Sequence, residues 1–217
     1  MSAIVRSFIN CIFGLSLVLL CSCHHRERAL PFYNTPDFTP VWIPENTSPG
    51  KIIDHRVGNF SFTDQAGESI SEKNVAGRIH VANFMFTSCG SICPKMMTNL
   101  LTLQKEFRNT DDVVLLSYSV TPWKDSVPRL KKYADQLGIE TAKWHLLTGN
   151  TSAIYELARR DYFAEEETGF QKDSSEFLHT EHFLLVDRDG YLRGVYNGTL
   201  ALEAERLAED IKELLKE

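Results

Sequence analysis

The sequence VANFMFTSCGSICPKMM, residues 81–97, decides the fold of this chain. Its first part is a largely apolar run that is typical of a buried strand. A polar turn with Cys89 and Cys93 follows, and Pro94 then opens a helix. Two thiols therefore lie where a strand meets a helix N-terminus. The unpaired N–H groups and the dipole at that position favour the thiolate, which is both a nucleophile and a metal ligand.

Length and composition indicate one soluble globular domain with appendages. The chain has 217 residues, of which 43% are hydrophobic and 24% are charged, and its formal net charge is −6 at pH 7. A domain takes about 100 to 200 residues, so we expect one. The acidic balance argues against nucleic acid as a partner, because proteins that bind nucleic acid carry a basic face.

Residues 1–22 indicate an export signal. Arg6 precedes an apolar run over 12–21, which suits a signal peptide and is short for a membrane span. The sequence Leu20-Cys21-Ser22-Cys23 resembles a bacterial lipobox, so we expect cleavage before Cys23 and lipidation of that residue. An uncleaved N-terminal anchor is the alternative. Both place the domain outside the cytoplasm and on a membrane, and the first makes the protein a periplasmic lipoprotein.

The stretch 23–50 carries the lipidated residue and is rich in proline, with few positions that suit a core. This composition favours an extended, partly polyproline tether. The globular domain is then expected over 51–217.

The cysteine count follows from this division. Cys11, Cys21 and Cys23 belong to the signal or anchor, so Cys89 and Cys93 are the only thiol pair of the domain. A disulfide that spans so short a loop restricts the unfolded chain little and stabilises a fold weakly. A redox or metal-binding role is therefore favoured over a structural one.

The order of the predicted elements indicates an α/β fold. We expect a central mixed sheet with helices on both faces and an N-terminal β-hairpin, because buried strands alternate with amphipathic helices. The predicted elements are a hairpin over 60–70, a helical turn capped by Ser71, a strand over 79–86, a helix over 94–108, a strand over 113–120, a helix capped by Asp125 and Ser126 that ends at Leu137, a short strand or turn over 144–147, a helix from Asn150, a surface loop over 161–176, a strand over 183–186, a return strand over 191–196 and a helix over 200–215.

This order, with a cysteine motif at the end of the first core strand, resembles the thioredoxin-like fold. The motif differs from that of thioredoxins, because three residues separate Cys89 from Cys93 and Pro94 follows the pair. No proline occurs after Pro128, so the cis-proline that thioredoxin-like reductases place before the third core strand is absent near Glu181. A dedicated disulfide reductase would be expected to keep it.

The globular part resembles the Sco/SenC family, copper-handling proteins that help to assemble cytochrome c oxidase. The resemblance covers roughly residues 55–215. Its specific motifs are FTSCGSICP, residues 86–94, and His179, eleven positions before Gly190 of a hairpin turn. His182 matches no ligand of the family.

The resemblance implies that Cys89, Cys93 and His179 bind copper. Two thiolates and one imidazole are a soft donor set that suits Cu(I) and, in a trigonal array, also accepts Cu(II). Three ligands with an open position would let a recipient protein take the metal.

Two positions depart from the family pattern. The acidic residue that many members carry after the second core strand is Thr121 here, and the aspartate that often precedes the distal histidine is Leu178. Both changes leave the ligands intact but remove acidic side chains that would support them.

Three functions from different classes remain open at this point. The first is a membrane-tethered copper metallochaperone, not an enzyme, that delivers copper to a respiratory protein such as a cytochrome c oxidase subunit. The alternative is a thiol–disulfide oxidoreductase, in which Cys89 and Cys93 are the redox-active pair that acts on cysteines of a partner. A peroxidase or redox sensor ranks last, because the motif lacks the threonine and proline that peroxidase-type relatives carry before the first cysteine.

Overall fold

The computed structural model describes residues 29–44, 46–164 and 180–217. Its central sheet contains β5 (Ile79–Met85), β6 (Val113–Ser119), β7 (Trp144–Leu147), β8 (His182–Val186) and β9 (Leu192–Asn197). These strands follow the order β7-β6-β5-β8-β9. β5, β6 and β7 are parallel, whereas β8 is antiparallel to β5 and β9 is antiparallel to β8. The predicted mixed sheet is confirmed.

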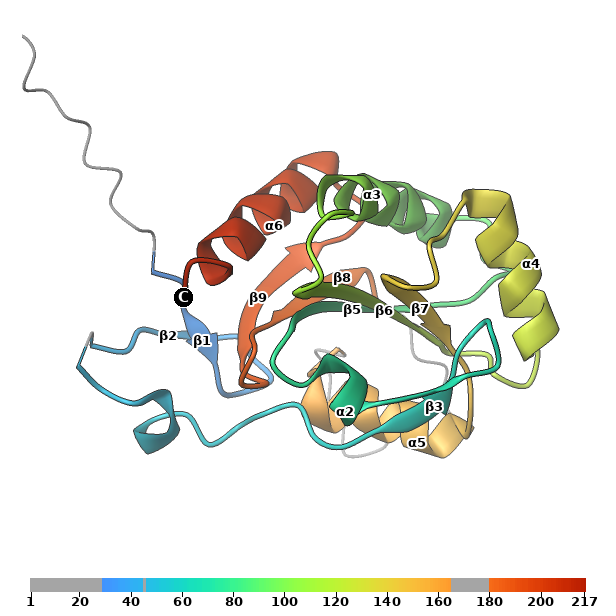
Figure 1. The fold of residues 1–217 in the computed structure, drawn as a ribbon. Helices are drawn as coiled ribbons and strands as arrows, with labels where there is room; N and C mark the ends of the chain where they lie inside the picture. Colours follow the sequence, from blue (N-terminus) through green and yellow to red (C-terminus); the bar gives the residue numbers. More distant parts are fainter. Residues whose placement is uncertain (1–28, 45, 165–179) are drawn as a thin grey trace, which may run out of the picture.

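Helices cover both faces of the sheet (Figure 1). One layer contains α3 (Ile92–Glu106), α4 (Val127–Leu137) and α6 (Ala201–Leu214), and the other contains α2 (Glu72–Val75), α5 (Thr151–Glu156) and the π-helical turn η2 (Leu157–Asp161). Every residue of β5 and β6 is buried, as expected for central strands covered on two sides. Alternate residues serve the two cores, since Met85 packs with the α3 side and Phe84 with the α5 side.

The predicted N-terminal hairpin is confirmed. β3 (Ser61–Thr63) pairs with β4 (Ser69–Ser71), and Gly67 in the turn has a φ of 86°. The α2 turn begins with a capping box in which Ser71 and Asn74 satisfy each other's backbone N–H groups.

Helix α3 begins at Ile92, two residues before the predicted start at Pro94. The first N–H groups of a helix have no partner within it, so a proline in the first turn removes no hydrogen bond. Cys93 therefore lies inside the first helical turn, and Cys89 lies on the turn that leads into it.

The expectation that the stretch before residue 51 has few core positions is wrong for Leu30 and Phe32, which are 4% and 8% exposed. β1 (Phe32–Tyr33) pairs with β2 (Pro40–Val41) and packs beside β9. The guanidinium of Arg193 lies 4.0 Å from the centre of the Phe32 ring and donates to the carbonyl oxygens of Leu30 and Pro31. A buried arginine thus holds part of the predicted tether on the domain.

Arg193→Leu is expected to lower the free energy of unfolding by about 2 kcal/mol, because the buried Asp187 carboxylate loses its ion-pair partner at 3.0 Å and two carbonyl groups lose a donor. Urea unfolding measures the loss, and limited proteolysis should show new cleavage within residues 30–41. Arg206→Leu is the control, since the half-exposed Arg206 pairs with Glu203 at the surface. That change is expected to stay within about 0.5 kcal/mol. Equal effects of the two variants would contradict the prediction.

Within the described ranges, the structure contains no helix that is both long enough and apolar enough to cross a membrane.

Candidate thiol and metal site

The structure brings the two predicted thiols together. Cys89 is half-buried on the turn after β5, and its N–H donates to the carbonyl oxygen of Phe86 at 3.2 Å. Cys93, in the first turn of α3, is 3% exposed and packs in the core that this helix covers. Both cysteines are free, and their side chains hydrogen bond to each other.

The two thiols have opposite pKa shifts. Burial alone would raise the pKa of Cys89, but its sulfur accepts hydrogen bonds from the N–H groups of Cys93, Ser91 and Ile92 and from the Cys93 thiol, which together hold that pKa below its ordinary value. Burial raises the pKa of Cys93 to about 12, and the neighbouring Cys89 adds to that effect. The turn therefore combines a partly exposed thiol that ionises readily with a buried one that keeps its proton.

Iodoacetamide is expected to label Cys89 at least about tenfold faster than Cys93 at pH 8, because the thiolate is the reactive form and Cys89 is the more exposed. The Cys89 rate should rise with pH and level off below the pH at which a free cysteine does. The Cys93 rate should still be rising above pH 10. Peptide mass spectrometry of the reduced protein at early times measures both rates, and equal labelling would contradict the pKa order.

His179, the third predicted ligand, lies outside the described residues, as do Cys23 and Leu178. The strand that follows His179 starts beside the cysteine turn. Ala82 of β5 pairs with Leu184 of antiparallel β8, so β8 begins at the end of the sheet where β5 ends.

Hydrogen bonds also connect the start of β8 to helix α3. The Gly198 N–H donates to the carbonyl oxygen of Glu181 at 2.7 Å, and the Asn99 side chain donates to the carbonyl oxygen of Gly198 at 2.8 Å. The chain thus enters β8 next to the helix that carries Cys93. Among the residues that the structure describes, no three His, Cys, Asp or Glu side chains are grouped to hold a metal ion.

Asp125 is the residue of this site that the sequence interpretation missed. Its predicted role as a cap of α4 is wrong, because that helix follows Ser126 and has no side-chain cap. The fully buried Asp125 carboxylate instead accepts from the Thr87 N–H at 3.1 Å, from the Thr87 hydroxyl, and from the Ser119 and Thr121 hydroxyls at 2.7 and 3.0 Å. It ties the ends of β5 and β6 together beneath the cysteine turn.

Arg129 completes this hydrogen-bond network. Its Nε donates to the Thr87 hydroxyl at 2.6 Å and lies 3.4 Å from the Asp125 carboxylate. Thr121, which replaces an acidic residue of the family pattern, is thereby bonded to a carboxylate four residues further along. The sequence signal that could have revealed this network is the pair of polar residues at the ends of two neighbouring parallel strands, Thr87 and Ser119.

Two other histidines, His80 and His145, have structural partners. His80 bonds through Nε2 to the Tyr162 hydroxyl at 3.0 Å, and burial lowers its pKa to about 3, so it stays neutral. His145 bonds to Asp64 of the hairpin turn at 2.9 Å. Their interpretation as structural residues is confirmed.

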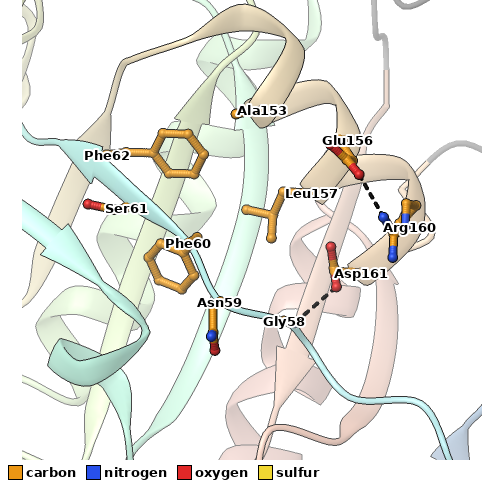
Figure 2. Close-up of a pocket in the computed structure, with 10 residues that line it drawn as sticks. All are labelled: Gly58, Asn59, Phe60, Ser61, Phe62, Ala153, Glu156, Leu157, Arg160 and Asp161. Carbon is orange, nitrogen blue, oxygen red and sulfur yellow. Dashed lines mark hydrogen bonds and ion pairs between the residues drawn. The ribbon is translucent and has the colours of Figure 1, made fainter.

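A separate hollow of about 390 Å³ lies beside α5 and η2 (Figure 2). These two elements are on the face of the sheet opposite α3 and α4 (Figure 1). Figure 2 shows Phe60 and Phe62 along its wall and Asp161 accepting from the Gly58 N–H at 3.0 Å. Its lining has no thiol or imidazole, so it contributes none of the predicted chemistry.

A mixed five-stranded sheet with a Cys-x-x-x-Cys turn between a core strand and its helix defines a thioredoxin-like α/β protein with a dithiol site. The SCO1/SenC family model matches residues 51–216, and the chain belongs to that family. The SCO1 protein homolog of Bacillus subtilis (strain 168) is 32% identical over 201 residues, which are 92% of each chain.

Solved structures agree with this assignment. A SCO1/SenC family lipoprotein from Bacillus anthracis str. Ames is 30% identical, with a TM-score of 0.63 over 74% of this chain and 95% of its own. BsSco, described as a member of the Sco family of cytochrome c oxidase assembly proteins with a disulfide switch, is 29% identical, with a TM-score of 0.61 over 74% and 93%. Bradyrhizobium japonicum ScoI, solved with copper bound, shares the fold at 23% identity, with a TM-score of 0.58 over 73% and 99%.

Proposed function

We propose that this protein is a membrane-tethered, extracytoplasmic copper metallochaperone. The observation that carries the proposal is the pair of free, hydrogen-bonded thiols on one turn at a helix N-terminus. Two thiolates suit Cu(I), and a copper ion bound there would displace the proton that Cys93 keeps. His179 is the proposed third ligand, and copper is the cargo of the site.

The recipient and the location belong to the same proposal. The Sco family of BsSco assembles cytochrome c oxidase, so we take a subunit of that oxidase as the respiratory recipient. Lipidation of Cys23 is the proposed tether to the membrane. The Bacillus anthracis relative, described as a lipoprotein, supports this part.

Anaerobic Cu(I) titration of the reduced mature chain, which begins at the lipidated Cys23, tests the proposal in detergent, with a chromophoric Cu(I) chelator as competitor. One Cu(I) per chain is expected, because the described site has a single thiol pair. His179→Ala should bind more weakly than the wild type, whereas His182→Gln serves as the matched control. Failure of the wild type to retain copper, or equal binding by His179→Ala, would overturn it.

The asymmetry of the two thiols favours a thiol–disulfide oxidoreductase as the second candidate function. A Cys89 thiolate would attack a disulfide of the partner and form a mixed disulfide, which the Cys93 sulfur would then resolve as it loses its proton. The partner leaves as a dithiol and Cys89–Cys93 becomes the disulfide. The disulfide switch described for BsSco is the parallel among the relatives.

Copper-free reduction of an oxidised cytochrome c oxidase copper-binding domain tests this second function. The wild type should reduce one disulfide per chain, and Cys93→Ser should accumulate the mixed disulfide. Reduction that proceeds without either cysteine would exclude this role.

A further inference from the structure

We propose that the groove between the cysteine turn and α4 docks an acidic segment of the protein that receives the copper. This inference rests on the proposed function, because it assigns a chemistry to the partner. The groove is about 340 Å³ and is lined by Thr87, Arg129, Lys132, Tyr133 and Gln136.

The groove reaches the turn that leads to Cys89. Thr87, two residues before Cys89, accepts a hydrogen bond from Arg129 on the first turn of α4. Tyr133 lies on the next turn and, like Cys89, packs against the core cluster that contains Cys93. A segment seated in the groove would therefore bring a partner's ligands to the exposed side of Cys89.

The side chains around this groove are cationic, although the chain as a whole carries a net charge of −6. Arg129 and Lys132 of the lining are exposed, as are Lys124 in the segment before α4 and Lys95 on α3. The Asp125 carboxylate, 3.4 Å from Arg129, is fully buried. Carboxylate side chains of a partner would complement these cations.

Helix stability does not explain this placement of charge. Lys95 and Arg129 lie in the first turns of α3 and α4, and neither first turn has an acidic residue. The dipole at a helix N-terminus favours acidic side chains and disfavours cations. Arg129 is held there by the Thr87 hydroxyl and the buried Asp125 carboxylate, so Lys95 is the cation that an anionic partner explains better than folding does.

Exposed apolar side chains lie at the same end of the sheet. Among the residues that the structure describes, five large apolar side chains are exposed, and Trp123, Leu200 and Leu202 are three of them, at 60%, 52% and 67%. Trp123 follows β6, and the two leucines follow β9, and both strands end where β5 ends. Tryptophan and arginine are enriched among residues that dominate protein interfaces. The partner segment is thus expected to pair its carboxylates with Arg129 and Lys132 and an apolar side chain with Trp123.

Fluorescence anisotropy with two labelled peptides tests this docking on the full chain in detergent. One peptide carries glutamates around a central leucine, and the other replaces every glutamate with lysine. The acidic peptide is expected to bind at least about tenfold more tightly than the basic one at low salt, and to weaken several-fold at about 0.2 M NaCl.

Lys132→Glu and Lys131→Glu form the matched pair. Each changes the net charge equally, but Lys132 lines the groove whereas Lys131 pairs with Asp135 at 3.2 Å. Lys132→Glu should lower the affinity for the acidic peptide at least about fivefold, and Lys131→Glu should lower it less than about twofold. Equal affinity for the two peptides, or equal effects of the two variants, would overturn the docking proposal.

The copper titration separates this inference from the proposed function. Lys132→Glu should retain one Cu(I) with unchanged affinity, because it touches neither thiol. If copper binding is unchanged but the protein shows no preference for the acidic peptide, the docking proposal is refuted and the metallochaperone proposal is not. A wild type that binds the peptide but no copper would refute the metallochaperone and this assignment of the partner.

Discussion

Cys89→Ser and Cys93→Ser are each expected to lower the affinity for Cu(I) by more than about 100-fold, since changes to groups that merely support a metal ligand already cost about 10- to 100-fold. Serine keeps the size of the side chain but replaces a soft thiolate with a hard hydroxyl, which Cu(I) binds poorly. The competition titration with a chromophoric chelator measures the loss for each variant in the mature chain.

The two cysteine variants should differ in pH dependence. Copper must displace the proton of Cys93, whose pKa burial raises to about 12, so wild-type affinity should increase with pH. In Cys93→Ser that proton is absent, and the increase should be smaller. In Cys89→Ser the increase should persist. Full copper affinity in either cysteine variant would contradict the proposed ligand set.

Asp125→Ala is expected to lower the free energy of unfolding by about 4 kcal/mol, because the Thr87 N–H and the Ser119 and Thr121 hydroxyls all lose a buried charged acceptor. The turn that carries Cys89 should loosen as Thr87 is released. Urea unfolding measures the first effect, and faster iodoacetamide labelling of Cys93 measures the second.

Two further variants define the role of Asp125. Asp125→Asn keeps an acceptor oxygen of the same shape and should lose about half as much stability, so it allows the test if the alanine variant does not fold. Asp135→Ala, on the exposed side of α4, is the control and should change stability by less than about 0.5 kcal/mol. An alanine variant at position 125 that is as stable as this control would contradict the role of Asp125.

The sequence predicted the parts of the fold that depend on periodicity. The two central strands are largely apolar and are buried along their whole length, and Gly138, with a φ of 72°, ends α4 at the predicted residue. The mixed sheet with helices on both faces also followed, because strands that alternate with helices leave few arrangements. The thiol pair was predictable because it was the only one outside the N-terminal stretch.

The interactions missed from the sequence are long-range polar contacts. An aspartate just before a helix is typical of a helix cap. Only the folded arrangement shows that the carboxylate oxygens of Asp125 accept hydrogen bonds from Thr87 and Ser119. Arg193 holds the early segment through the backbone carbonyls of Leu30 and Pro31, which leave no mark in the sequence. The contacts of Asp125 with Thr87 and of Arg193 with Leu30 and Pro31 join residues far apart in the chain, so neither periodicity nor spacing predicts them.

The docked segment around Phe32 would also limit how far the protein reaches from a membrane to which the proposed lipid holds it. A free tether from a lipidated Cys23 to residue 51 would extend up to roughly 95 Å, whereas Ala29, beside the docked Leu30, is six positions after Cys23, or at most roughly 20 Å away. With Arg193 holding Leu30 and Pro31, the proposed lipid and the domain surface stay within that shorter span. A recipient would then meet the domain close to the bilayer surface, which suits a copper protein that is itself embedded in the membrane.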